Sequence, residues 1–270
     1  MNNSKYLLAS KAKVERAIFN INYLESEFKN YNESKPYELK NELDPSTNDI
    51  ILVYYPLQPI PTNWSVIIGE IIFNLRSALD IAVFEMTVNE NGSNLKGTEF
   101  PIFEDRNIFY EVKKDGQYTN RSGIYKIRGL NDKSKQIIES IQPFNILNNE
   151  ETSILSLLHE MNITDKHKQL HLCRCLATST KVIITKDICD MIDWSMSVGT
   201  KLDQRAIISR LHLKNIHDNI DFLTANIDIS IEFDKTCSLN FKKSEKVIYI
   251  LNSFEKCVQQ ILYLLENSNI

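Results

Sequence analysis

Glycine and proline, the two residues most typical of tight turns, are scarce in this chain: seven of each occur among 270 residues. Glycine supplies positive φ angles and proline interrupts helices, so a low content of both favours long helices over a turn-rich sandwich. The five cysteines are an odd number and form no CxxC pair. This pattern argues against a disulfide scaffold and predicts a reducing, cytoplasmic location.

Long apolar runs and an excess of one charge are also missing. No segment approaches the ~18 apolar residues of a membrane span, and charges interrupt the N-terminal residues, so we predict neither a signal peptide nor a membrane partner. The net charge of −4 gives no global basic excess for nucleic acid, although a local patch can still bind it. Neither a GxG phosphate loop nor a GxSxG motif occurs, and we predict no cofactor.

Apolar periodicity predicts a mostly helical α+β protein. Strand-like segments rich in β-branched residues separate the helices, and residues 99–103 and 124–128 look like short extended pieces. We predict a helical bundle core over 1–177, a β-rich element over 178–240, and a C-terminal helix within 241–270 that packs back on the bundle. The predicted helices are 4–30, 62–90, 130–142, 150–175 and 244–266, and the predicted strands are 49–57, 181–184, 206–213 and 227–233.

A first polar cluster lies inside the apolar helix 62–90. Glu70 and Asn74 share one face, while Arg76 and Asp80, four residues apart on a neighbouring stripe, can pair. Two interpretations of these four residues remain open. They form either a solvated surface with one exposed ion pair or a polar site that becomes buried when further helices pack on it.

A second cluster lies on the predicted helix 150–175. His159, Asn162 and Lys166 share one face, and Asp165 lies beside them. On another face, His167, His171 and Cys175 have the i, i+4, i+8 spacing of metal ligands, but no HExxH-like acidic motif accompanies them, and we predict no metal. Because buried charges need partners, we expect the two helices to be neighbours and the two clusters to touch.

Four segments resemble a family of largely uncharacterised bacterial proteins. They are GEIIFNLRSALDI, EFPIF, IRGLNDKSKQIIESIQPF and LLHEMNITDKHKQL, in residues 64–172. The family pattern reads GD-x-L-H-N-L-R-S-A-L-D-H, then F-P-I, then a "GL…QP" helix, then N-x-x-D-K-H-R. Its Arg-to-His element also resembles the R-x4-6-H motif of HEPN helical domains. The resemblance implies an HEPN-like helical bundle, with the β-rich element inserted before the C-terminal helix.

Many HEPN proteins are metal-independent ribonucleases of toxin–antitoxin and phage-defence systems, in which Arg and His act on the RNA phosphate and the 2′-hydroxyl. Arg76 matches the motif arginine, but Ile81 occupies the histidine position and cannot transfer a proton. Lys168 replaces the arginine that follows the family's Lys-His. The implied catalytic residues are Arg76, Asp80, and His159 or His167 in place of the missing histidine; the implied binding residues are Glu70, Asn74, Asn162, Asp165 and Lys166.

Two functions follow from the sequence. The first is a cytosolic bacterial HEPN-like protein, a metal-independent ribonuclease or its degenerate relative in phage defence or stress response, with RNA as a partner and a homodimer as its assembly. The second is a non-catalytic binding or structural module whose polar cluster holds the bundle together or holds a small ligand.

Overall fold

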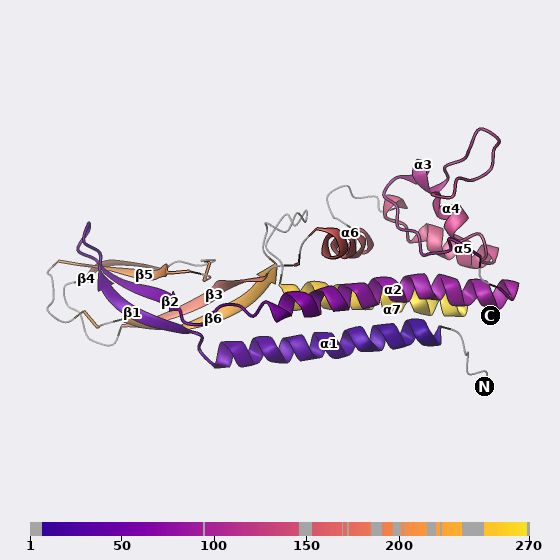
Figure 1. Ribbon diagram of the computed structural model, residues 1–270. Helices are drawn as coiled ribbons and strands as arrows, with labels where there is room; N and C mark the ends of the chain where they lie inside the picture. The colour runs from indigo at the N-terminus through magenta and orange to yellow at the C-terminus, as the bar shows by residue number, and fades with distance from the viewer. Residues whose placement is uncertain are drawn as a thin grey trace.

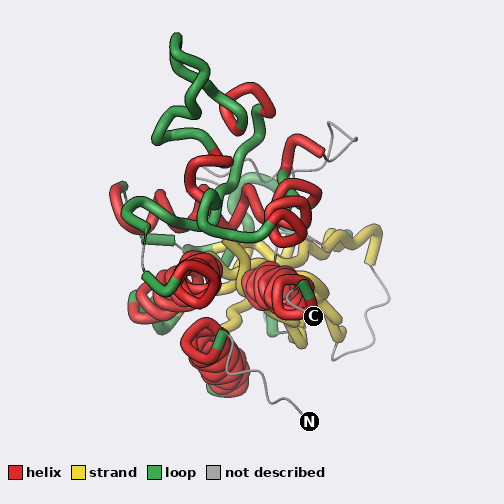
Figure 2. The backbone as a smooth tube through the Cα atoms, turned by 90° about the vertical axis from the view of Figure 1, so that its right-hand side faces the viewer, coloured by secondary structure: helices red, strands yellow, loops and turns green. Residues whose placement is uncertain are grey.

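Three long helices run side by side along the molecule in the computed structural model (Figure 1). They are α1 (Leu8–Glu33), α2 (Asn63–Asn91) and α7 (Val247–Asn267), and Figure 2 views them down their axes. The structure describes residues 7–93, 95–145, 153–168, 170–171, 173–184, 191–196, 201–202, 204–214, 220–221, 223–233 and 246–268.

Contacts at both ends fix the helix directions. Near the start of α1, the Ser10 hydroxyl donates to Glu85 late in α2 at 2.8 Å, and the Phe28 ring packs on Trp64 at the start of α2 with ring centroids 4.6 Å apart. Lys11 pairs with Glu266, near the end of α7, at 2.7 Å. Helix α1 is therefore antiparallel to both α2 and α7.

Helix α2 is the central element of the helical layer. It is buried on most of its circumference, which is the burial expected of a helix covered on several sides. It ends at Asn91 because Gly92 adopts the left-handed conformation (φ 69°), and its N–H donates back to the Val88 carbonyl. The helix predicted over 62–90 is confirmed to within one residue at each end.

Two small antiparallel sheets lie beyond the C-terminal end of α1 (Figure 1). The four-stranded sheet has the order β1 (Tyr37–Leu43), β2 (Ile50–Pro56), β5 (Ala206–Leu213), β4 (Met191–Met196). The two-stranded sheet pairs β3 (Cys173–Ile184) with β6 (Leu223–Phe233). Asn41 joins the two sheets: its side-chain amide donates to the Leu223 carbonyl at 2.9 Å and accepts from the Leu223 N–H at 3.2 Å.

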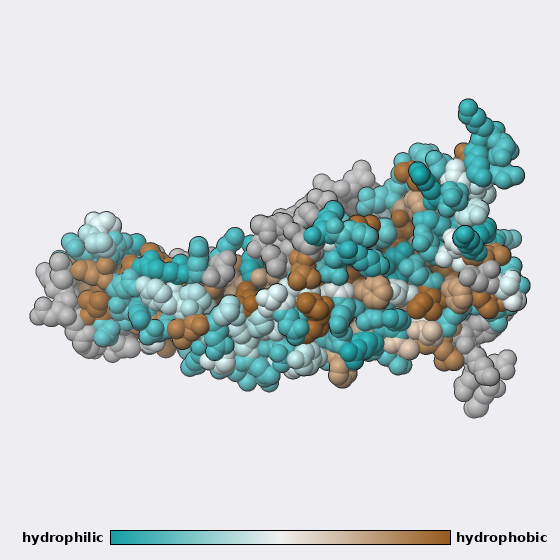
Figure 3. Space-filling view, viewed as in Figure 1, coloured by the Kyte–Doolittle hydropathy of each residue, from teal (hydrophilic) through white to brown (hydrophobic). Residues whose placement is uncertain are grey.

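Shorter helices cover α2 on one side. Helix α6 (Ile154–His167) crosses α2, since Figure 1 shows α6 nearly end-on while α2 runs across the page. The irregular region that precedes it contains α3 (Arg106–Phe109), α4 (Gly123–Lys126), α5 (Asp132–Ser140) and the 3₁₀ turn Pro143–Asn145. None of the described helices has a stretch long and apolar enough to span a membrane. Polar and apolar residues are intermixed on the face of the molecule that Figure 3 shows.

The α+β class is confirmed, and the structure changes several boundaries. The sheets extend beyond segment 178–240, since β1 and β2 precede α2 and β3 begins at Cys173. Helix 150–175 was predicted too long, because α6 ends at His167. The extended piece predicted at 124–128 is wrong, since the Ser122 hydroxyl caps a helical turn there. Parts of the predicted helices 4–30, 150–175 and 244–266 lie outside the described ranges.

Candidate functional site

The Arg76–Asp80 pair holds the main chain of Phe100. Arg76 is 6% exposed; its Nη1 donates to Asp80 Oδ1 at 2.6 Å and its Nη2 donates to the Phe100 carbonyl at 2.8 Å. The Phe100 N–H donates to the same Asp80 oxygen at 3.0 Å. The pair predicted from the i, i+4 spacing therefore forms, and it binds both polar groups of one residue in an irregular segment.

Gln142 holds the same segment from the other side. It is fully buried; its amide nitrogen donates to the carbonyls of Pro101 and Ile138, both at 3.0 Å, and its amide oxygen accepts from the Phe103 N–H at 3.0 Å. Side chains from two other segments of the family pattern therefore bind the main chain of FPIF (residues 100–103). These segments are FNLRSALD (73–80), which contains Arg76 and Asp80, and IQPF (141–144), which contains Gln142. The analysis by residue type missed Gln142, although its place directly before Pro143 at the end of α5 was a usable signal.

The two polar helices touch where α6 crosses α2. A Cβ atom on Gly69 would lie 2.5 Å from Asp165 Oδ1, so α6 can approach this closely only because residue 69 has no side chain. One turn further, the Lys166 ammonium lies 4.8 Å from the centroid of the Phe73 ring, a cation–π contact. The two helices are therefore neighbours as expected, but within the described residues no hydrogen bond or ion pair joins the two polar clusters.

His159, on α6, lies among positively charged groups. Burial, together with the charges of Arg76, Lys126 and Lys166 and against an opposite effect of Glu99, lowers its pKa from 6.5 to about 4. Its Nδ1 is buried and has no hydrogen-bond partner within the described ranges. At neutral pH His159 is an uncharged imidazole, which can accept a proton but has no imidazolium proton to give.

Two further charged residues border this site, and sequence reasoning missed them. Lys126, on α4, pairs with Glu99 at 2.6 Å, and its ammonium also lies 5.1 Å from the centroid of the Phe103 ring. Beside them, burial raises the pKa of Asp80, and this effect outweighs the charge of Arg76 and the Phe100 N–H. Glu99 begins the EFPIF segment, but nothing in the sequence indicates that this irregular segment pairs with Lys126 on α4.

The other predicted site residues do not join this cluster. Glu70 and Asn74 face α1, where Glu70 accepts from the Asn20 amide at 3.1 Å and Asn74 accepts from the Lys13 ammonium at 3.0 Å. Asn162 is buried within α6, and His167, the last residue of α6, is exposed. Helical periodicity assigned Glu70 and Asn74 to one face, but it could not say which neighbour that face meets.

The shared helical face predicted for His167, His171 and Cys175 is wrong, because the helix does not continue beyond His167. His171 Nε2 hydrogen-bonds with the Met161 carbonyl at 2.9 Å, and its ring meets the Phe233 ring edge-on. Cys175 lies on β3. Within the described residues, no group of three or more His, Cys, Asp or Glu side chains could hold a metal ion.

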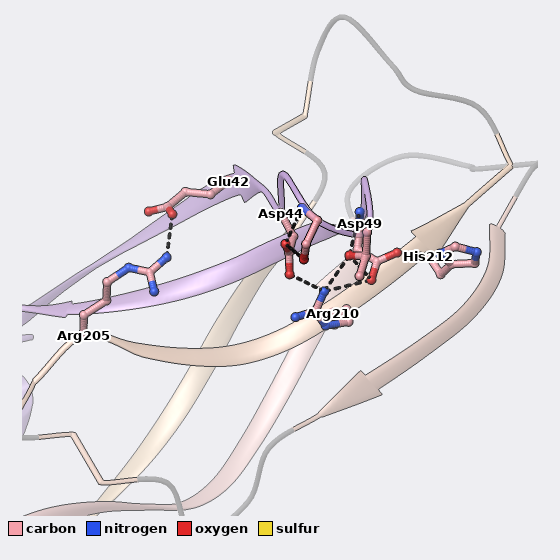
Figure 4. A network of polar contacts seen from close by, with 8 residues as sticks. Glu42, Asp44, Asp49, Arg205, Arg210 and His212 are labelled. Atoms are coloured by element: carbon pink, nitrogen blue, oxygen red, sulfur yellow. Dashed lines mark hydrogen bonds and ion pairs between the residues drawn. The ribbon is translucent and has the colours of Figure 1, made fainter.

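A separate polar network ties the β1–β2 turn to β5 (Figure 4). Arg210 Nη1 donates to Asp44 at 2.7 Å and to Asp49 at 2.8 Å, and His212 Nδ1 is hydrogen-bonded to the other oxygen of Asp49. Burial alone would raise the pKa of Asp49, but the hydrogen bonds from His212, Arg210 and Thr47 outweigh it and lower the pKa. The network anchors the turn to the sheet.

Comparison of the chain with protein-family models, with curated proteins and with solved structures gives no match.

Proposed function

We propose that the protein is an HEPN-like RNA-binding protein that does not cleave RNA. The observation that carries this proposal is the burial of Arg76, whose two terminal nitrogens are bound to Asp80 and to the Phe100 carbonyl. An arginine acting on an RNA phosphate must present its guanidinium to the substrate. Arg76 can do so only by giving up its hydrogen bonds to the Phe100 carbonyl, which is then left unpaired, and to Asp80, at a cost of about 1–3 kcal/mol. At the motif histidine position, Ile81 has no proton to transfer.

A cationic and aromatic surface supports RNA as the partner. The Phe73 side chain is 42% exposed, and two ammonium groups flank its ring: Lys13 from α1 at 5.4 Å from the centroid and Lys166 from α6 at 4.8 Å. Lys166 forms no ion pair with any described carboxylate. Exposed aromatic rings stack on unpaired bases, and lysines neutralise phosphates, so this combination suits a single-stranded RNA.

A binding titration tests this surface. A fluorescein-labelled single-stranded 12-nucleotide RNA is titrated with the full chain at 50 and 200 mM salt, and anisotropy is measured. We expect Lys166→Ala to weaken binding and to reduce the salt dependence by about one phosphate contact, and Phe73→Ala to weaken it about tenfold. Lys29→Ala, a highly exposed lysine on α1, is the matched control and leaves binding unchanged. Absence of binding at 50 mM salt rejects the proposal.

A metal-free cleavage assay tests the second half of the proposal. Wild type, Arg76→Ala and Ile81→His are incubated with RNA in EDTA, and products are separated on a gel. We expect no cleavage by wild type and only a lowered melting temperature for Arg76→Ala. Cleavage by Ile81→His alone would show that wild type is a degenerate member of a catalytic family.

One observation favours metal-independent cleavage of RNA as a second candidate. His159 is an uncharged imidazole at neutral pH and can accept a proton, and the nearby cations Arg76, Lys126 and Lys166 can attract a phosphate. If wild type cleaves RNA, His159→Ala should lose about 10²–10⁴-fold in rate. His167→Ala, at the exposed end of α6, is the control.

A further inference from the structure

Helix α1 carries a stripe of cationic and aromatic side chains that begins beside Phe73. This α1 stripe consists of Lys13, Arg16, Phe19 and Tyr23, and none of the four belongs to the buried face of the helix. Successive members are three or four residues apart, which is the spacing that makes side chains neighbours on a helix. The stripe is therefore one continuous surface.

Lys13 connects the α1 stripe with the Phe73 surface. Its ammonium donates to the Asn74 amide oxygen on α2 at 3.0 Å and lies 5.4 Å from the centroid of the Phe73 ring. Lys166, on α6, contacts the same ring at 4.8 Å. Side chains from three helices thus continue into the stripe without a break, and a ligand bound at Phe73 can extend onto α1.

The stripe presents two further rings to solvent. Phe19 is 61% exposed and Tyr23 is 44% exposed, and the guanidinium carbon of Arg16 lies 5.2 Å from the centroid of the Phe19 ring. Single exposed apolar residues are normal on a protein surface, but a cluster of them marks an interaction site. Aromatic faces and guanidinium planes both stack on nucleic-acid bases.

The charge of the stripe favours a polyanion as its partner. Lys13 and Arg16 form no ion pair with a carboxylate in the part of the chain that the structure describes. The nearby acids lie off the stripe or at its end: Glu15 faces the groove between α1 and α7, and Glu27 follows Tyr23 by one turn. A second copy of the chain seated on this surface would bring like charges together, which is unfavourable.

We propose that single-stranded RNA bound at Phe73 continues along α1, with bases stacked on Phe19 and Tyr23 and phosphates at Lys13 and Arg16. This inference rests on the RNA binding proposed above. From Lys13 to Tyr23 the helix rises about 15 Å, which a strand with about 3.4 Å per nucleotide covers in roughly four to five nucleotides. The ligand is therefore a run of unpaired nucleotides, because bases inside a duplex cannot offer their faces to the rings.

Binding to the full chain is measured by fluorescence anisotropy, with a labelled 12-nucleotide single strand and a 12-base-pair RNA duplex. We expect the duplex to bind at least tenfold more weakly. Phe19→Ala should weaken binding of the single strand about tenfold, and Arg16→Ala should reduce the salt dependence by about one phosphate contact. Tyr263→Ala is the matched control, because Tyr263 is a 67% exposed aromatic residue on α7, outside the stripe, and it should leave binding unchanged.

The outcomes separate this inference from the Phe73 site itself. Binding that weakens in Phe73→Ala but is unchanged in both Phe19→Ala and Arg16→Ala, with all variants shown to be folded by circular dichroism, overturns the path along α1 and leaves the Phe73 site in place. Equal affinity for the duplex also overturns the path. Absence of binding by wild type rejects both proposals.

Sedimentation velocity tests a second copy as the occupant of the stripe. We expect wild type and Phe19→Ala to have the same oligomeric state. A wild-type dimer that Phe19→Ala converts to a monomer, without a change in RNA affinity, would assign Phe19 to a contact between copies and would overturn the proposal.

Discussion

Arg76 is bound to main-chain atoms as well as to a side chain, and this distinguishes it from a surface ion pair. Its partners lie on α2 itself and on the irregular segment 99–103, and the whole side chain is 8% exposed. The spacing of Arg76 and Asp80 predicted their pairing. It could not predict Phe100 as the second partner, because a main-chain group carries no signature in the sequence.

Removal of Asp80 should therefore cost more than removal of a surface carboxylate. We expect Asp80→Ala to lower the free energy of unfolding by on the order of 2–4 kcal/mol, since Arg76 loses a partner while buried and the Phe100 N–H loses its acceptor. Asp80 is itself 39% exposed, so water compensates part of this loss. Urea denaturation measures the change.

The matched control is Glu33→Ala. Glu33 pairs with Lys29 at the same i, i+4 spacing, but both side chains are more than 60% exposed. Such pairs contribute a few tenths of a kcal/mol. Equal losses for Asp80→Ala and Glu33→Ala would contradict the role assigned to Asp80 as an anchor of the chain.

His159 should make stability depend on pH in a defined window. Its folded pKa of about 4 lies below the ordinary 6.5, so between pH 6.5 and 4 the unfolded chain binds a proton that the folded chain does not. Stability is complete above pH 6.5 and falls as the pH decreases, by on the order of 1–2 kcal/mol at pH 4, because solvent screens this partly exposed ring.

His159→Gln removes this contribution, and the difference between the two unfolding curves isolates it from the other titrating groups. We expect wild type minus His159→Gln to decrease from pH 7 to pH 4. A constant difference would show that His159 is not held uncharged in the folded protein.

The crossing of α6 over α2 shows which contacts between elements are readable in a sequence. Polar residues in two apolar helices predicted that the helices meet, because both sets of charges needed partners. The absence of a side chain at Gly69, where Asp165 comes closest, defines the crossing point. That role could not be assigned beforehand, because a glycine within a helix does not indicate what lies against it.

Gly69→Ala tests this crossing. In an exposed helix this substitution stabilises by roughly 1 kcal/mol, but here the new methyl group would overlap Asp165. We expect a loss of about 1–3 kcal/mol in urea denaturation, the range for overpacking. In an Asp165→Ala background, the same substitution should be neutral or stabilising. If Gly69→Ala destabilises both backgrounds equally, Asp165 is not the obstacle.

The strands were harder to predict than the helices. Segment 49–57 was identified correctly because five consecutive buried residues, Ile50 to Tyr54, form a β-branched and aromatic run. Residues 173–175 were assigned to a helix, because a short apolar stretch next to a helical pattern fits either structure. Strand β1 was missed because its alternation consists of half-buried and exposed residues, which gives a weak apolar signal.

At the scale of the whole molecule, the sheets join parts of the chain that are distant in sequence. Strand β2 pairs with β5 across more than 150 residues, from Ile50 with Leu211 to Tyr54 with Ala206. Helix α7 packs against both α1 and α2. Periodicity identifies elements but not how they pair. The sequence therefore indicated a β-rich insertion before the last helix, whereas the four-stranded sheet of the structure also contains β1 and β2, which lie between α1 and α2.

The fragment 1–177 should therefore not fold alone. It would lack β5, the inner partner of β2, and α7, which covers the apolar faces of α1 and α2. We expect its circular dichroism to show no cooperative thermal transition, whereas the full chain unfolds in one. A cooperative transition in the fragment would identify residues 1–177 as an independent domain.

Residues 99–103 form neither helix nor strand, yet side chains of two other elements hold their amides. The Phe100 N–H is bound to Asp80 and the Phe103 N–H to Gln142. Hydrogens in irregular segments usually exchange rapidly with solvent, but these two can exchange only when α2 or the end of α5 releases them. The rate of deuterium uptake at Phe100 therefore reports how often its bond to Asp80 opens, and the rate at Phe103 reports how often its bond to Gln142 opens. Asp80→Ala should accelerate exchange at Phe100 alone, and Gln142→Ala should accelerate exchange at Phe103 alone.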